Sequence, residues 1–131
     1  MNKELWQRAE DVAHDLRMLH TLIALVRRYS RRVPPYPISG ELLDIITTLD
    51  AIADCARTLS SEQRDKFRGA AFDIEIPFAL AREARREFTS EERHRVQETI
   101  KNLLTELENL ISRLEKEETF LWERIGKDTG L

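Results

Sequence analysis

The segment LWQRAEDVAHDLRMLHTLIALV, residues 5–26, sets the fold class of this 131-residue chain. Its apolar residues recur at alternating spacings of four and three: Leu5, Ala9, Val12, Leu16, Leu19, Ile23 and Val26. Such spacing places an apolar stripe along one side of a helix and leaves charged residues on the other sides. The segment therefore predicts a long amphipathic helix over residues 3–32. Its end is marked by Pro34, Pro35 and Pro37, because proline lacks the amide N–H that a helix needs.

The same periodicity continues through the rest of the chain. It predicts three more helices, over residues 39–59, 61–88 and 90–125. The last two open with capping boxes, in which Ser or Thr is followed three residues later by Gln or Glu: Ser60 with Gln63, and Thr89 with Glu92. Short connections favour antiparallel neighbours. We therefore expect an all-α protein, one up-down-up-down four-helix-bundle domain over residues 1–131, with long first and fourth helices.

The composition excludes several classes of protein. With 41% hydrophobic and 34% charged residues, the chain is too apolar to be disordered. One Cys excludes a disulfide framework, and three His exclude a His-rich metal centre. No segment approaches the roughly 20 apolar residues that span a bilayer. We expect a cytoplasmic protein without a membrane partner.

Two residues inside the predicted helices invite specific expectations. Pro77 lies within the third helix, where it removes one hydrogen bond, so we expect a kink there. The bend is either simply tolerated or a functional hinge. Cys55 lies among apolar residues of the second helix and is expected to be a small core residue.

The predicted helix lengths are unequal, since the first and fourth helices are much longer than the second. In an up-down bundle the start of the first helix lies beside the end of the fourth. At roughly 1.5 Å per residue, this outer pair should project past the inner pair by more than a turn. Trp6 and Trp122 both lie in the projecting part. They either pack on each other or form an interface with a partner protein.

Charge is distributed unevenly despite the formal net charge of -3. The topology brings nine arginines to one end of the bundle: Arg27, Arg28, Arg31, Arg32, Arg82, Arg85, Arg86, Arg93 and Arg95. The guanidinium group suits phosphate and stacks on bases, which favours a nucleic acid or an acidic protein as partner. The alternative is that these cations only stabilise helix C-termini, although Arg93 and Arg95 lie at a helix start.

No pattern in the sequence indicates an enzyme. Glu91 and His94 have the Glu-x-x-His spacing of a di-iron bundle, but no second such motif accompanies them. Arg8 and His14 loosely match the Arg–His spacing of helical ribonucleases of the HEPN group. We therefore expect no catalytic residues, no metal and no cofactor, and we keep a small nuclease as a minor alternative.

The stretch RRYSRRVPPYPISGELL, residues 27–43, resembles the first connection of the accessory variability proteins of diversity-generating retroelements. Their relatives are four-helix proteins encoded in intervening sequences of bacterial large-subunit ribosomal RNA genes. The similarity covers residues 20–114. It implies a non-enzymatic subunit of a ring-like homopentamer that binds a reverse transcriptase and its RNA.

Two functions follow from these observations. The first is a homo-oligomeric adaptor that binds RNA, DNA or a reverse transcriptase through the nine arginines, which the charge distribution identifies and no family motif does. The second is a helical protein–protein interaction module that does not bind nucleic acid and uses Trp6 and Trp122 or other exposed apolar residues.

Overall fold

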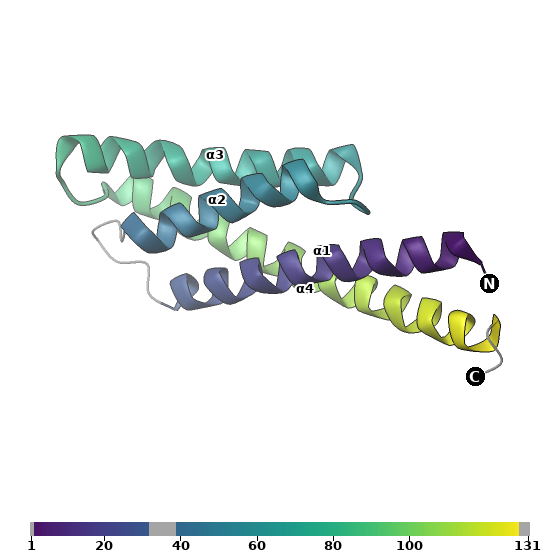
Figure 1. Cartoon of the computed structure of the whole chain (residues 1–131). Helices are drawn as coiled ribbons and strands as arrows, with labels where there is room; N and C mark the ends of the chain where they lie inside the picture. The colour runs from purple at the N-terminus through teal and green to yellow at the C-terminus, as the bar shows by residue number, and fades with distance from the viewer. Residues whose placement is uncertain (1, 32–38, 129–131) are drawn as a thin grey trace.

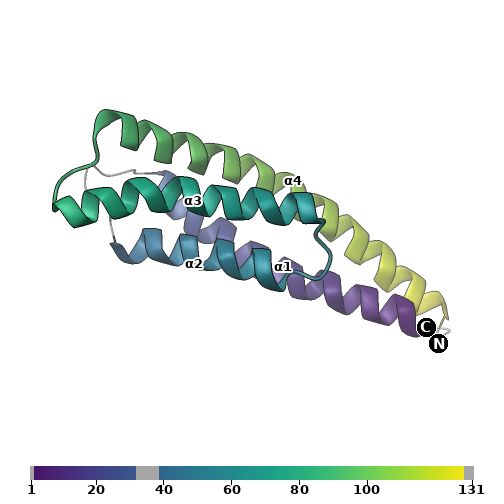
Figure 2. The ribbon, with the colours of Figure 1, turned by 90° about the horizontal axis from the view of Figure 1, so that it is seen from above.

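The computed structural model describes residues 2–31 and 39–128, which form four helices. They are α1 (Lys3–Ser30), α2 (Ser39–Cys55), α3 (Ser61–Ala84) and α4 (Ser90–Asp128). Consecutive helices run antiparallel, and α1 lies against both α2 and α4 (Figures 1 and 2). The predicted all-α four-helix arrangement with long outer helices is confirmed. We call the end where α1 and α3 finish and α2 and α4 begin the arginine end.

Helix starts follow from local side chains. The Asn2 side chain accepts hydrogen bonds from the amides of Glu4 and Leu5 and so caps α1. The predicted capping boxes both form, Ser60 with Gln63 before α3 and Thr89 with Glu92 before α4. The apolar rows of all four helices meet in one buried core. Burial of these rows is what stabilises the bundle.

The second helix is shorter than expected, because it ends at Cys55 rather than near residue 59. Asp15 of α1, which is 1% exposed, accepts hydrogen bonds from the amides of Arg57 and Thr58 and turns the chain there. Cys55 is exposed, so its predicted place in the core is wrong. The core contact at this end of α2 is made by Ile52, Ala53 and Ala56, and Cys55 lies outside that row.

The third helix also ends early, at Ala84 instead of near Phe88. Arg85 adopts the left-handed conformation with φ of 51°, and the following amide of Arg86 bonds to the carbonyl of Ala81. This turn carries Phe88 back to the core, where it is buried. Pro77 is buried and α3 continues through it. The bend expected there does not divide the helix.

The outer helices project beyond the α2–α3 turn, as their lengths predict (Figures 1 and 2). The fourth helix passes Gly126 and ends at Asp128, so the stop expected near residue 125 is wrong. Trp6 and Trp122 pack edge to face in the projecting part, with ring centroids 5.3 Å apart. Leu121 and Ile125, on the same part of α4, are buried in the core. The bundle therefore stays packed past the point where α2 and α3 finish.

No helix within residues 2–31 and 39–128 is long and apolar enough to cross a membrane.

Candidate anion-binding site at the arginine end

The structure places eight of the nine predicted arginines at or near the arginine end, and the ninth, Arg32, lies outside the described residues. The antiparallel order of the helices produces this gathering, because residues 27–31, 82–86 and 93–95 belong to segments that meet there. The eight side chains nevertheless have different surroundings, which divide them into three groups.

Three arginines are held by carboxylates. Arg86 donates to both oxygens of Glu92, at 2.6 and 3.2 Å, and this hydrogen bonding holds the pKa of Glu92 down at about 2. Arg95 lies 3.3 Å from Asp73, and Arg27 lies 3.7 Å from Glu108. These contacts direct the three guanidinium groups towards acids of their own chain.

Two more arginines belong to the α2–α3 side. Arg82 lies over the ring of Phe78, 5.9 Å from its centroid, a favourable cation–π distance. Arg85 has the left-handed backbone that ends α3. Both line a groove between α2 and α3 together with Glu75 and Glu83, so cations and anions balance along it. The groove does not favour an anion.

The α1–α4 side of the arginine end differs in charge from the balanced α2–α3 groove. A pocket of about 620 Å³ lies between the end of α1 and the start of α4. We call it the arginine pocket and define it by its described lining residues: Ser30, Arg31, Arg93, Gln97, Ile100, Lys101 and Leu104. All the charged side chains among these residues are cations. Arg28 is exposed on the same last turn of α1.

The pocket combines three features that suit a phosphate ester. Arg31, Arg93 and Lys101 supply positive charge from two helices. Ser30 and Gln97 contribute neutral polar side chains, and the partly exposed Leu104 contributes apolar surface, with Ile100 buried in the core behind it. Stabilisation of helix dipoles explains Arg27 and Arg28 in the last turn of α1, but it does not explain Arg93 or Lys101 near the start of α4.

A buried tyrosine lies under this end of the bundle. Tyr29 is fully buried, and its hydroxyl has no hydrogen-bond partner among the described residues. Burial raises the pKa of Tyr29 far above its ordinary value; the nearby Glu41 carboxylate adds to the rise and Arg93 opposes it. Tyr29 is therefore neutral at physiological pH and adds no negative charge beside the pocket.

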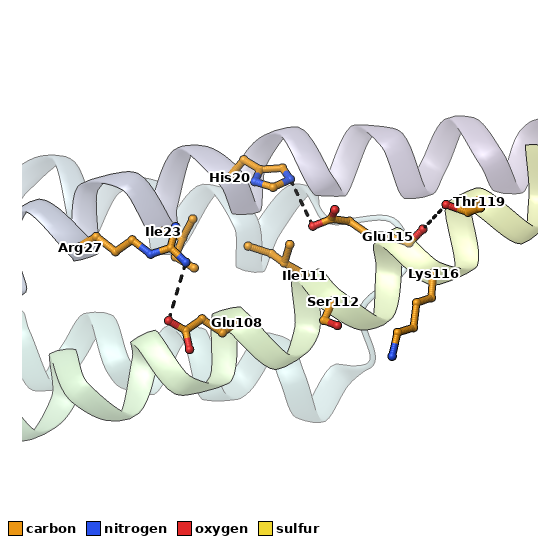
Figure 3. Close-up of a pocket in the computed structure, with 9 residues that line it drawn as sticks. All are labelled: His20, Ile23, Arg27, Glu108, Ile111, Ser112, Glu115, Lys116 and Thr119. Atoms are coloured by element: carbon orange, nitrogen blue, oxygen red, sulfur yellow. Dashed lines mark hydrogen bonds and ion pairs between the residues drawn. The ribbon is translucent and has the colours of Figure 1, made fainter.

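A larger groove of about 710 Å³ extends along α1 and α4 from Arg27 towards the projecting part. Figure 3 shows His20 facing Glu115 across it, at 3.9 Å, and Arg27 facing Glu108. Ile111 lies between these two pairs, and Ile23 lies beside Arg27. The groove is near neutral, because Arg27 and Lys116 among its lining residues are balanced by Glu108 and Glu115. We interpret these pairs as cross-helix contacts that align α1 with α4.

The residues considered for catalysis do not form one site. Arg8 donates to Glu117 of α4 at 2.6 Å, whereas His14 lies 2.9 Å from the buried Asp15. The two side chains of the HEPN-like spacing thus have separate partners on separate sides of α1. Within the described residues, no group of three or more His, Cys, Asp or Glu is placed to hold a metal ion.

Lys101 and Gln97 line the arginine pocket but were not among the site residues predicted from the sequence. Arg93, Gln97 and Lys101 follow one another at intervals of four and so share one side of α4. That spacing could have identified them. What it could not show is that this side of α4 meets the end of α1, because the rotation of each helix depends on core packing.

Comparison of the chain with protein-family models, with curated proteins and with solved structures gives no match.

Proposed function

We propose that this protein is a non-enzymatic helical adaptor that binds the phosphate backbone of a nucleic acid, with RNA as the expected ligand. The observation that carries the proposal is the arginine pocket, whose charged lining residues in the described chain are Arg31, Arg93 and Lys101. Cations drawn from two helices give a local positive potential although the chain has a net charge of -3. Phosphate contacts of this kind dominate the affinity of proteins for nucleic acids.

The resemblance of residues 20–114 to retroelement accessory proteins supports the same proposal. Proteins of that family bind a reverse transcriptase together with its RNA, and a reverse transcriptase is accordingly the protein partner we propose. The acidic residues beyond the pocket, such as Glu108 and Glu115, would repel a phosphate backbone. We therefore expect contact to be confined to the arginine end.

The test is a binding titration with a fluorescently labelled single-stranded RNA of mixed sequence, measured by anisotropy at low and at physiological salt. The variant Arg31→Gln/Lys101→Gln removes two pocket cations from two helices. We expect binding at low salt that weakens steeply as salt increases, and affinity at least tenfold lower in the variant.

The matched control is Arg17→Gln/Lys116→Gln, which removes one arginine of α1 and one lysine of α4 outside the pocket. It causes the same change in net charge, so we expect less than a threefold loss. An equal loss in both variants would show binding by overall charge and contradict the proposed site. Undetectable binding of wild-type protein at low salt would reject the function.

A protein-binding module without nucleic-acid binding is the second candidate. It is favoured by Phe120 and Trp122, which are 56% and 42% exposed in the projecting part of α4. This function predicts a partner protein whose binding tolerates high salt and is weakened by Trp6→Ala or Trp122→Ala. The RNA titration separates the two candidates, because only the first requires the arginine pocket.

A further inference from the structure

The positive lining of the arginine pocket is short. On α4 it extends from Arg93 to Lys101, a length of about 12 Å at roughly 1.5 Å per residue. On α1 the described lining cation is Arg31, and Arg28 is exposed on the same last turn. A surface of this length can contact only a few phosphates of a nucleic-acid strand.

The positive lining ends one turn farther along both helices. Arg27 lies four residues before Arg31, and Glu108 lies four residues after Leu104, so each stays on the same side of its helix. Arg27 and Glu108 pair at 3.7 Å, where the near-neutral groove between α1 and α4 begins. A phosphate backbone that continued into this groove would meet Glu108 and then Glu115 (Figure 3). A strand therefore gains no favourable charge by extending along α1 and α4.

The other grooves of the described surface contain acids as well. Glu108 and Glu115 line the α1–α4 groove, Glu75 and Glu83 line the α2–α3 groove, and Glu106 lines both grooves between α3 and α4. Among these grooves, a charged lining made only of cations is a property of the arginine pocket. The pocket is therefore a local site for phosphate, and no cationic groove continues from it across the described surface.

A site that reaches few phosphates gains most from the phosphate with the largest charge. An internal phosphodiester carries one negative charge, whereas a terminal phosphate monoester carries about −1.5 to −2 at pH 7 and offers three acceptor oxygens. We propose that the arginine pocket binds the terminal phosphate of an RNA strand. This inference rests on the proposed function and narrows its ligand from a phosphate backbone to the end of one.

The lining residues provide donors from two helices for such a group. Arg31 of α1 and Lys101 of α4 supply charged donors, which form stronger hydrogen bonds to phosphate than neutral donors do. The Ser30 hydroxyl donates to the Arg27 carbonyl at 3.0 Å, and rotation about one bond would redirect it to a phosphate oxygen. Three acceptor oxygens can use these donors more fully than the two free oxygens of a diester.

The experiment is a competition assay against a labelled single-stranded RNA with hydroxyl ends, bound to the full chain at low salt. The unlabelled competitors share one sequence and end in a 5′-phosphate, in a 3′-phosphate or in hydroxyl groups only. We expect a terminal phosphate to lower the competitor concentration for half displacement about tenfold. The matched control is a hydroxyl-ended RNA that is two nucleotides longer, because it adds a similar charge as internal diesters. It should gain less than threefold.

Two variants connect this preference to the pocket. Arg31→Gln/Lys101→Gln should abolish the preference for a terminal phosphate, whereas Arg17→Gln/Lys116→Gln should keep it, with circular dichroism confirming that both are folded. Equal competition by phosphate and hydroxyl ends would overturn end recognition, while RNA binding that is still lost in the pocket variant would leave the proposed function intact.

Three other results would also contradict the proposal. A preference that persists in Arg31→Gln/Lys101→Gln would place the terminal phosphate outside the pocket. Competition by uridine monophosphate as strong as that of the phosphorylated RNA would make the ligand a free nucleotide instead of a strand end. Failure of the labelled RNA to bind at low salt would reject the proposed function itself, and the inference with it.

Discussion

Asp15 and Thr58 are 43 residues apart in the chain, yet two hydrogen bonds join them: Asp15 Oδ2 accepts from the Thr58 amide at 2.7 Å and from its hydroxyl at 2.5 Å. The same carboxylate accepts from the amide of Arg57 at 2.9 Å. A carboxylate that is 1% exposed needs such partners, because an unpaired buried charge is strongly destabilising. Asp15 thereby fixes the α2–α3 turn to the middle of α1.

Replacing Asp15 by Asn should destabilise the fold. The amide group keeps one acceptor oxygen but presents N–H groups towards the donors of Arg57 and Thr58. We expect a loss of about 2–4 kcal/mol in the free energy of unfolding, measured by urea denaturation. Asp11→Asn, one turn earlier, is the control, because Asp11 is only half-buried and its hydrogen bonds among the described residues are with side chains, those of Gln7 and Arg57. Equal losses in the two variants would contradict the role assigned to Asp15.

Acid should remove the stabilisation that Glu92 provides. Its pKa in the folded state is about 2, below the ordinary value of 4.5, mainly because Arg86 donates to the carboxylate. A lowered folded-state pKa stabilises the protein fully above pH 4.5 and progressively less as the pH falls towards 2. The measurement is the free energy of unfolding between pH 2 and 7 for wild type and Glu92→Gln.

We expect the difference between these two proteins to be largest above pH 4.5 and to vanish near pH 2. Glutamine at this position can still complete the capping box with Thr89, so the comparison isolates the charge. Glu91→Gln, at the neighbouring exposed position, should leave the pH dependence unchanged. A Glu92→Gln difference that does not vary with pH would contradict the assignment.

Trp6 and Trp122 should be energetically coupled. Their edge-to-face contact closes the projecting part of α1 and α4, and such pairs contribute about 0.5–1.5 kcal/mol beyond the area they bury. Each variant should lower the free energy of unfolding. We expect the sum of the losses in Trp6→Ala and Trp122→Ala to exceed the loss in the double variant by about 1 kcal/mol. Urea unfolding followed by circular dichroism measures all three variants. Strictly additive costs would show that the rings do not stabilise each other.

Lys101 should contribute one phosphate contact. Lys101→Gln is expected to lower the salt dependence of RNA binding, the slope of log K against log salt, by about 1. Lys116→Gln removes the same charge from the same helix, and Figure 3 shows Lys116 extending away from α1. It should leave the slope unchanged. A slope that changes equally in both variants would place the contact outside the arginine pocket.

Local sequence suffices for the number, order and starts of the helices. The apolar period of residues 5–26 and the two capping boxes depend on groups at most a few residues apart. Both features can therefore be predicted from the sequence alone. The projection of α1 and α4 past the inner helices, and the presence of Trp6 and Trp122 at the same end, follow from helix length and antiparallel order. Their edge-to-face contact is known only from the structure.

Tertiary packing determines those features of the fold and the site that the spacing of apolar residues does not predict. Asp15 accepts a hydrogen bond from the amide of Arg57, 42 residues away in the chain, just after α2 ends at Cys55, and no local signal in the sequence predicts that contact. The arginines gather at one end as topology requires. Which of them meets a carboxylate and which borders Lys101 depends on the rotation of each helix about its own axis. That rotation is set by how the buried side chains interlock, which periodicity along a single helix does not specify.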